Sequence, residues 1–417
     1  MSDLSTFSIE LDASSGVYRH GERLTGSLQI VLAKAMTLRE IRLQIKGRAA
    51  WHEEAKKGGE VEKVYVNRDI ILLERPPGQP VAGEWDWDAG RHVLPFECPL
   101  AKSSPTSFEG SKAYVRYFAR AILTQRETPK KDRKFVTKCP FTLLGPPPSA
   151  ISPELLKPVG SAQSATVSGC CCMRGSLSGE MGLGKSVFVS GETVYGSLKV
   201  ENKHSRKPID GVLLQLVELL RREASGGQPA PAPLRRVLLE RRLDNSSIAP
   251  RENWQVDNLD LIKVPAVAPS FRIEALYSLN YELVVKAGNR LAVPIPLTIG
   301  NIPLSSDDGA PPPTGYQPFV LGAQDVKDAE DPADLYEGAS YAPLYPVFEG
   351  SSLHYPNPSP AKAGLNEEAK TLEETMLKET EEEVTLELTE SGGKAGLENG
   401  TQLLLTPDGL QHPIAEE

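Results

Sequence analysis

Residues that form disulfides or bind metals are scarce in this sequence, which has 5 cysteines and 6 histidines among 417 residues. Three cysteines are adjacent (Cys170, Cys171 and Cys172), and no second set of spaced cysteines or histidines accompanies them. Disulfide frameworks and zinc sites both need ligands spaced along the chain. We therefore expect neither a disulfide scaffold nor a bound metal. The adjacent cysteines are candidates for reversible palmitoylation, with plain reduced thiols as the alternative.

Long hydrophobic runs are also absent. Nowhere do 18 apolar residues follow one another, and no apolar run near the start resembles a signal peptide. A membrane-spanning helix needs about 20 such residues. No histidine stands in a nucleophile-elbow context, and no paired carboxylates fall on an expected site loop. We expect a cytoplasmic protein without catalytic activity, cofactor or small-molecule substrate.

Charge is distributed unevenly along the chain. The net charge is −9, but residues 304–417 hold 23 acidic residues against 5 lysines, so the remainder is basic. A basic body predicts anionic partners, such as phosphorylated segments or an anionic membrane surface, and an acidic tail predicts competition for them. The candidate contact residues are Lys130, Lys131, Arg133, Lys134, Arg235 and Arg236. A solvated strand face is the alternative, and nucleic acid is not expected because no aromatic residues interleave with these clusters.

Alternation of apolar and polar residues dominates the first 300 residues. Leu38, Ile41, Leu43 and Ile45 alternate with Arg42, Gln44 and Lys46, and Leu28, Ile30 and Leu32 repeat the pattern in the preceding segment. The stretch Tyr114–Leu123 is a longer strand candidate that is apolar on both faces. Many short strands separated by glycine and proline predict an all-β fold built from β-sandwiches.

The sequence repeats itself once at a distance of about 160–170 residues. In the first landmark, Gly21, Glu22, Gly26, Ser27 and Leu28 recur as Gly191, Glu192, Gly196, Ser197 and Leu198. In the second, Ser107, Phe108 and Tyr117 correspond to Ser270, Phe271 and Tyr281. In the third, Pro140–Gly145 corresponds to Pro296–Gly300. The order of these landmarks predicts two copies of one antiparallel β-sandwich, each with its own core.

The repeat sets the expected domain boundaries. We expect a first sandwich over 5–146, a linker over 147–165, a second sandwich over 166–304 and an acidic, proline-rich disordered tail over 305–417. Within the tail, Asn366 could cap a helix, and Leu365, Ala369, Leu372 and Met376 fall at helical spacing around it. This pattern predicts a short helix near 366–380 that forms when it docks.

Residues Gly179–Ser186 match the phosphate-binding loop pattern G-x-x-x-x-G-K-S. That loop needs a helix after it, whose amide groups hold the phosphates. Here a strand-like segment, Val187–Val189, leads to Gly191, in register with the first copy. We interpret the glycines as part of a hairpin and keep nucleotide binding as the least favoured alternative.

The landmarks resemble the arrestins, in particular the alpha-arrestins or arrestin domain-containing family. The stretch Gly90–Leu100 followed by Pro105–Gly110 is similar to arrestin N-domains, and Val293–Leu304 resembles the strand that closes the alpha-arrestin C-domain. The cysteine cluster ahead of the second copy is also typical of that family. The resemblance covers about three-quarters of the chain.

The resemblance implies two tandem arrestin-like sandwiches in a non-enzymatic adaptor that links membrane protein cargo to trafficking, endocytosis and HECT-type ubiquitin ligases. Such a protein is recruited to the plasma membrane or endosomes. The family contacts the ligases through a Pro-Pro-x-Tyr motif, which WW domains read as a polyproline turn. Here the motif is incomplete, and the candidate WW contacts are Pro312, Pro313, Tyr316, Pro343 and Tyr345. No cysteine lies between Val187 and Leu304, where the thioredoxin-binding family member uses one. An arrestin-fold coat subunit of a retromer-like complex is the alternative.

Overall fold

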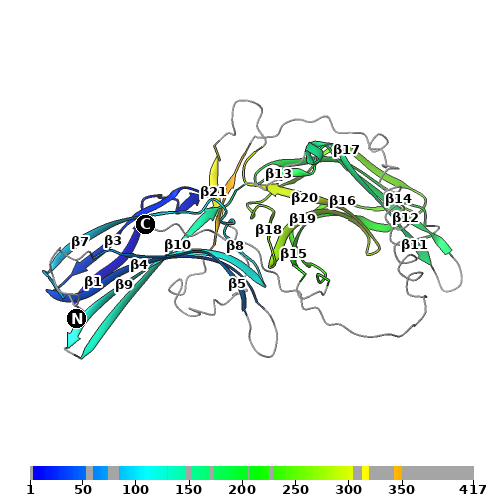
Figure 1. The fold of residues 1–417 in the computed structure, drawn as a ribbon. Helices are drawn as coiled ribbons and strands as arrows, with labels where there is room; N and C mark the ends of the chain where they lie inside the picture. Colours follow the sequence, from blue (N-terminus) through cyan, green and yellow to red (C-terminus); the bar gives the residue numbers. More distant parts are fainter. Residues whose placement is uncertain are drawn as a thin grey trace, which may run out of the picture. The chain divides into compact units, whose positions relative to one another are not determined.

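The computed structural model describes residues 3–52, 60–73, 84–128, 130–146, 153–168, 173–204, 206–224, 229–303, 312–318 and 342–349. Apart from one 3-10 turn at Pro153–Leu156, the described elements are strands (Figure 1). They form two sandwiches, which confirms the predicted all-β class. The expected helix at 366–380 and the three adjacent cysteines lie outside the described residues.

The first sandwich has two sheets. The smaller has the order β1-β3-β7, from Leu4–Leu11, Arg23–Leu32 and Gly90–Pro99. The larger has the order β2-β10-β9-β4-β5, from Val17–Arg19, Lys131–Leu144, Ala113–Thr128, Met36–His52 and Glu60–Ile71. Two short strands join the larger sheet at its margins, β6 (Trp85–Trp87) on β4 and β8 (Phe108–Glu109) on β9.

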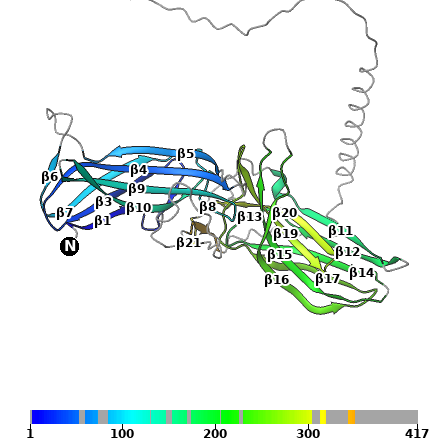
Figure 2. The same cartoon turned by 90° about the horizontal axis from the view of Figure 1, so that it is seen from below.

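The second sandwich repeats this plan. One sheet has the order β11-β12-β14-β17, from Val159–Ser168, Met173–Leu183, Thr193–Asn202 and Asn253–Lys263. The other has the order β13-β20-β19-β15-β16, from Val187–Val189, Leu291–Gly300, Tyr277–Ala287, Ile209–Arg222 and Leu234–Ile248, with β18 (Phe271–Ile273) on β19. Figure 2 shows the two layers from a second direction.

The two copies of the sequence repeat have equivalent strand pairings. Most strands pair antiparallel, but β2 runs parallel to β10 and β13 runs parallel to β20. A tight turn follows the short strand in each copy. The carboxylate of Glu22 accepts the amide of Arg19 at 2.7 Å, and the carboxylate of Glu192 accepts the amide of Val189 at 3.1 Å. The first landmark is therefore a turn signature.

The core of each sandwich follows the alternation in the sequence. In β4, the side chains of Leu38, Ile41, Leu43 and Ile45 have no exposed surface, as predicted. The expected strand at Tyr114–Leu123 is the first part of β9, which pairs with β4 on one side and β10 on the other. Its side chains are buried on both faces of the sheet except at the half-buried Arg120 and Ile122, which explains why all of this stretch but Arg116 and Arg120 is apolar.

Two features differ from the expected boundaries. Strand β11 begins at Val159, inside the expected linker, and pairs with β12. It is a largely exposed edge strand of small polar residues, so it lacks an apolar pattern. In the expected tail, β21 (Gly315–Pro318) and β22 (Leu344–Val347) pair as a separate two-stranded sheet.

Candidate functional site at the junction of the sandwiches

The second sequence landmark fixes a loop in each sandwich. In the first copy, the hydroxyl of Tyr117 donates to the carbonyl of Pro105 at 2.8 Å, and the amide of Leu143 donates to the hydroxyl of Ser107 at 2.9 Å. The second copy repeats both bonds. Tyr281 donates to the carbonyl of Ala268 at 2.7 Å, and the amide of Ile299 donates to the hydroxyl of Ser270 at 3.0 Å. The landmark therefore holds each loop against the last long strand of its sandwich.

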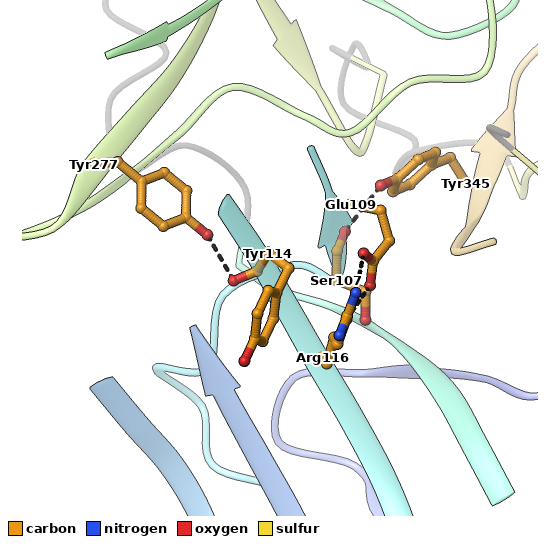
Figure 3. Close-up of polar contacts among 6 residues, drawn as sticks. All are labelled: Ser107, Glu109, Tyr114, Arg116, Tyr277 and Tyr345. Atoms are coloured by element: carbon orange, nitrogen blue, oxygen red, sulfur yellow. Dashed lines mark hydrogen bonds and ion pairs between the residues drawn. The ribbon is translucent and has the colours of Figure 1, made fainter. Parts of the chain in front are cut away.

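The phenylalanines that follow these serines meet at the junction. The rings of Phe108 and Phe271 lie edge to face with centroids 5.6 Å apart, a favourable aromatic geometry. The ring of Tyr277 lies 5.9 Å from that of Phe271, and its hydroxyl donates to the carbonyl of Tyr114 at 2.9 Å (Figure 3). The side-chain amide of Asn301 adds a 2.7 Å bond to the carbonyl of Gly145.

A buried ion pair supports the first sandwich's side of the junction. The guanidinium of Arg116 donates to both carboxylate oxygens of Glu109, at 2.6 and 2.8 Å, and lies 4.1 Å from the ring centroid of Tyr114 (Figure 3). Burial raises the pKa of Glu109, and Arg116 opposes this shift. This pair was not predicted from the sequence. Arg116 is, with Arg120, one of two charged residues in the otherwise apolar stretch Tyr114–Leu123, and a charge in such a stretch is the signal that could have found the pair.

A segment of the expected tail lies on the same junction. We call residues 342–349, which include β22, the clasp segment. The hydroxyl of Tyr345 donates to the carbonyl of Ser107 at 3.0 Å (Figure 3), and the amide of Leu344 donates to the hydroxyl of Thr142 at 3.0 Å. The amide of Phe348 donates to the carbonyl of Ser190 at 2.9 Å, in the second sandwich. The clasp segment thus bonds both sandwiches.

A cleft of about 730 Å³ opens beside the junction. Its lining comes from both sandwiches and includes Tyr65, Thr106, Arg221, Phe271 and Arg272. Arg272 pairs with the carboxylate of Glu223 at 2.6 Å, and Arg221 is exposed at the end of β15. Proline, aromatic and cationic side chains together suit an extended, partly acidic polypeptide better than a small apolar ligand.

The structure places Tyr316 on β21 and Tyr345 on β22, and the candidate prolines precede these two strands. Pro312 is exposed, and Pro313 and Tyr316 are half-buried. Pro343 and Tyr345 are buried, with Tyr345 only 1% exposed. A WW domain reads its proline and tyrosine on an exposed turn. In this conformation, Tyr345 is therefore bound by the chain itself.

The basic candidates fall on two separate elements. Lys130 lies in the turn before β10, and Lys131, Arg133 and Lys134 lie at the start of that strand. Arg235 and Arg236 lie near the start of β16 in the second sandwich. Several of these cations have acidic partners: Lys131 with Glu127 at 2.6 Å, Arg235 with Glu282 at 2.7 Å and Arg236 with Glu218 at 2.7 Å. The structure therefore does not gather them into one patch.

The phosphate-loop pattern lies in strand and turn. Residues Gly179–Leu183 belong to β12, and β13 follows at Val187 where the nucleotide-binding alternative requires a helix. The amine of Lys185 is buried and bonds the carboxylate of Glu192 at 2.5 Å. Within the described ranges, no group of three or more histidine, cysteine, aspartate or glutamate side chains is placed to hold a metal. No helix among those same ranges is long and apolar enough to cross a membrane.

Each of the two sandwiches matches a known protein domain. The family model described as "Arrestin (or S-antigen), N-terminal domain" matches residues 7–141, and the corresponding C-terminal domain matches residues 174–304. Arrestin domain-containing protein 17 of Caenorhabditis elegans is 27% identical over 316 residues, which cover 73% of this chain and 72% of that protein. Arrestin domain-containing protein 4 of Mus musculus is 27% identical over 312 residues, which cover 70% and 71%. Arrestin domain-containing protein 1 of Homo sapiens is 25% identical over 367 residues, which cover 85% and 78%. Arrestin-family proteins are adaptors, and this chain belongs to the arrestin domain-containing family, the alpha-arrestins.

Proposed function

We propose that this chain is a non-enzymatic cytoplasmic adaptor that binds the cytoplasmic segments of membrane protein cargo and directs them into endocytosis and sorting. The observation that carries the proposal is the cleft lined by both sandwiches, with Arg221 at its wall. An extended cargo segment placed there contacts both domains at once. Anionic residues in that segment pair with Arg221, and its apolar residues pack on Tyr65 and Phe271.

Quantitative surface labelling of cells tests this function. Expression of the chain should remove a reproducible set of membrane proteins from the plasma membrane, and Arg221→Glu should abolish the effect by repelling acidic segments. Arg290→Glu is the matched control, because Arg290 is exposed but lies at a different cavity, on the β19–β20 turn. A surface proteome that the intact chain leaves unchanged would refute the cargo function. An effect that Arg221→Glu preserves would move the cargo site away from the cleft.

The proposed link to HECT-type ubiquitin ligases runs through Pro343 and Tyr345. Both residues are buried in the clasp segment, so a WW domain reaches them only after that segment leaves the junction. A peptide of residues 340–346 should therefore bind WW domains more tightly than the full chain does, and Tyr345→Ala should abolish binding of the peptide. A peptide without measurable affinity would remove this route to the ligases.

A stoichiometric complex would instead favour the coat-subunit alternative. Size-exclusion chromatography of native extracts distinguishes the two functions, because an adaptor elutes mainly apart from its cargo and a coat subunit elutes with constant partners.

A further inference from the structure

The clasp segment is held in the way that a bound peptide is held. Tyr345, Val347 and Phe348 are all less than 5% exposed, although no described strand of either sandwich pairs with β22. Within the described ranges, its strand partner is the four-residue β21. Side chains buried against a domain without sheet continuity are typical of a docked segment, and such a segment can leave without breaking either sandwich.

The surface beneath the clasp segment belongs to the sandwiches themselves. We call it the seat and define it by Ser107, Thr142, Ser190, Gly191 and Lys263. Ser107 is fixed by two bonds to Leu143. The amide of Ser107 donates to the carbonyl of Leu143 at 2.8 Å, and the amide of Leu143 donates to the hydroxyl of Ser107 at 2.9 Å. The hydroxyl of Ser190 accepts the amide of Val267 at 3.2 Å. These bonds do not involve the clasp segment, so the seat retains its shape when that segment leaves.

The seat offers hydrogen-bond acceptors in a fixed order. The hydroxyl of Thr142 accepts the amide of Leu344, the carbonyl of Ser107 accepts the phenol of Tyr345, and the carbonyl of Ser190 accepts the amide of Phe348. A buried acceptor left without a donor lowers the stability of the complex, so any other occupant of the seat must supply hydrogen-bond donors at the same spacing. The amine of Lys263 donates to the carboxylate of Glu349 at 2.8 Å, so the seat also favours an acidic residue directly after the phenylalanine.

Gly191 gives the seat a steric requirement. Its φ is +91°, and a Cβ there would lie 2.6 Å from the Cγ1 of Val347 and 2.9 Å from the amide nitrogen of Phe348. The equivalent Gly21 of the first sandwich also has a positive φ, +78°, but a Cβ there would meet only the flexible side chain of Lys102. Docking of the clasp segment therefore requires glycine at position 191. At the equivalent position 21, a side chain would not meet the clasp segment.

We propose that the seat is a protein-recognition surface for an extended segment of a partner protein with the pattern leucine-tyrosine-proline-valine-phenylalanine-acid, and that the clasp segment is its internal, displaceable occupant. The clasp segment supplies the recognition pattern residue by residue. This surface is distinct from the cleft proposed for cargo, so the two proposals fail independently. A partner that carries the same pattern binds the seat only in competition with residues 342–349.

Fluorescence anisotropy with a labelled nine-residue peptide, Ala-Pro-Leu-Tyr-Pro-Val-Phe-Glu-Gly, tests the proposal on the full chain. The variant Tyr345→Ser/Phe348→Ser empties the seat and should bind the peptide at least about tenfold more tightly than the unmodified chain, whose own segment competes at high effective concentration. Replacing the tyrosine of the peptide with phenylalanine should weaken binding about fivefold or more, through the unpaired carbonyl of Ser107. Equal binding by the emptied and unmodified chains would overturn the proposal.

Two further variants separate docking from damage to the fold. Gly191→Val, added to the emptied chain, should abolish peptide binding, whereas Gly21→Val imposes similar backbone strain and should leave binding intact. Loss of binding with both, or with neither, would contradict the assignment of the seat. If the emptied chain does not melt cooperatively, the milder Tyr345→Phe chain takes its place and should still bind more tightly than the unmodified chain. A peptide that carries a photoreactive phenylalanine in the place of Phe348 should crosslink to the part of the emptied chain that contains Gly191. Crosslinks to other parts of the chain would refute the assignment of the seat as the binding surface.

Discussion

Tyr345 and Ser107 are 238 residues apart in the sequence, yet the buried hydroxyl of one donates to the carbonyl of the other at 3.0 Å. This bond links a segment beyond the second sandwich to a landmark loop of the first. Because Phe348 bonds Ser190 in the second sandwich, the same short segment contacts both copies of the repeat. The junction therefore combines repeated residues, which meet as Phe108 and Phe271, with one element that is not repeated.

The repeated tyrosines should make equivalent contributions to stability. Tyr117→Phe and Tyr281→Phe each remove one hydrogen bond from a buried tyrosine to a loop carbonyl and should lower the free energy of unfolding by about 1–2 kcal/mol. Urea unfolding of the two variants measures this. A change confined to one of them would show that the two loops are not held in the same way.

Removing one partner of the buried pair Arg116–Glu109 should lower the stability of the chain strongly, whereas replacing both partners with apolar residues should lower it little. Arg116→Met leaves the carboxylate of Glu109 buried alone and should destabilise the chain by about 3–5 kcal/mol at neutral pH. The added change Glu109→Leu should recover most of this loss, because apolar residues often replace a buried pair at little cost. A double variant that is as unstable as Arg116→Met would contradict this account.

The same variant should show a characteristic dependence on pH. Burial raises the pKa of Glu109 in the folded chain, and removal of Arg116 raises it further. A carboxyl group with a raised folded-state pKa favours folding when it is protonated, so stability falls as pH rises from its unfolded value toward the folded pKa. The deficit of Arg116→Met should therefore shrink as the pH is lowered from 7 toward about 4.5. A deficit independent of pH would show that Glu109 is not the group left uncompensated.

Glu201 should behave in the opposite way. Hydrogen bonds from Lys199 and Lys203 lower its pKa to about 2. Its contribution to stability is present above the unfolded pKa and is lost as pH falls toward about 2. Glu201→Gln should therefore have its largest effect near neutral pH and almost none at the acid limit, as urea unfolding at both pH values would show. NMR titration of the carboxyl carbon that gives an ordinary glutamate pKa would contradict this.

Gly47 should be intolerant of any side chain. A Cβ there would overlap the ring of Tyr117, which has no exposed surface, so Gly47→Ala should cost about 1–3 kcal/mol by overpacking. Gly315 is the matched control, since a Cβ at that position meets nothing within 4 Å. Calorimetric melting of both variants measures the difference. Equal melting temperatures would show that the core adjusts around Tyr117.

Much of the fold could be predicted because the burial pattern repeats. The apolar residues Leu38, Ile41, Leu43 and Ile45 are the ones that the fold buries. The turn residue Glu22 of the first copy recurs in the sequence as Glu192 of the second. Strand β11 could not be predicted, because an exposed edge strand does not need apolar residues. The phenylalanine contact at the junction was also beyond prediction, since the repeat identifies Phe108 and Phe271 as equivalent but does not show that they meet.

The candidate site was the least predictable part. Tyr345 lies in a stretch rich in proline, glycine and acidic residues, where composition predicts disorder. Its burial depends on acceptors at Ser107, Thr142 and Ser190, which lie far away in the sequence. The local pattern predicts Tyr345 as a contact for WW domains but could not show that the chain itself buries it.

Hydrogen exchange of the clasp segment in the full chain, followed by mass spectrometry, tests the central claim most directly. The amides of Leu344 and Phe348 are bonded to Thr142 and Ser190, so the peptide covering 342–349 should exchange at least about 100-fold more slowly than the same peptide free in solution. Tyr345→Ala should bring that exchange close to the free rate and leave the amides of β4 protected. Exchange at the free-peptide rate in the unmodified chain would contradict the account.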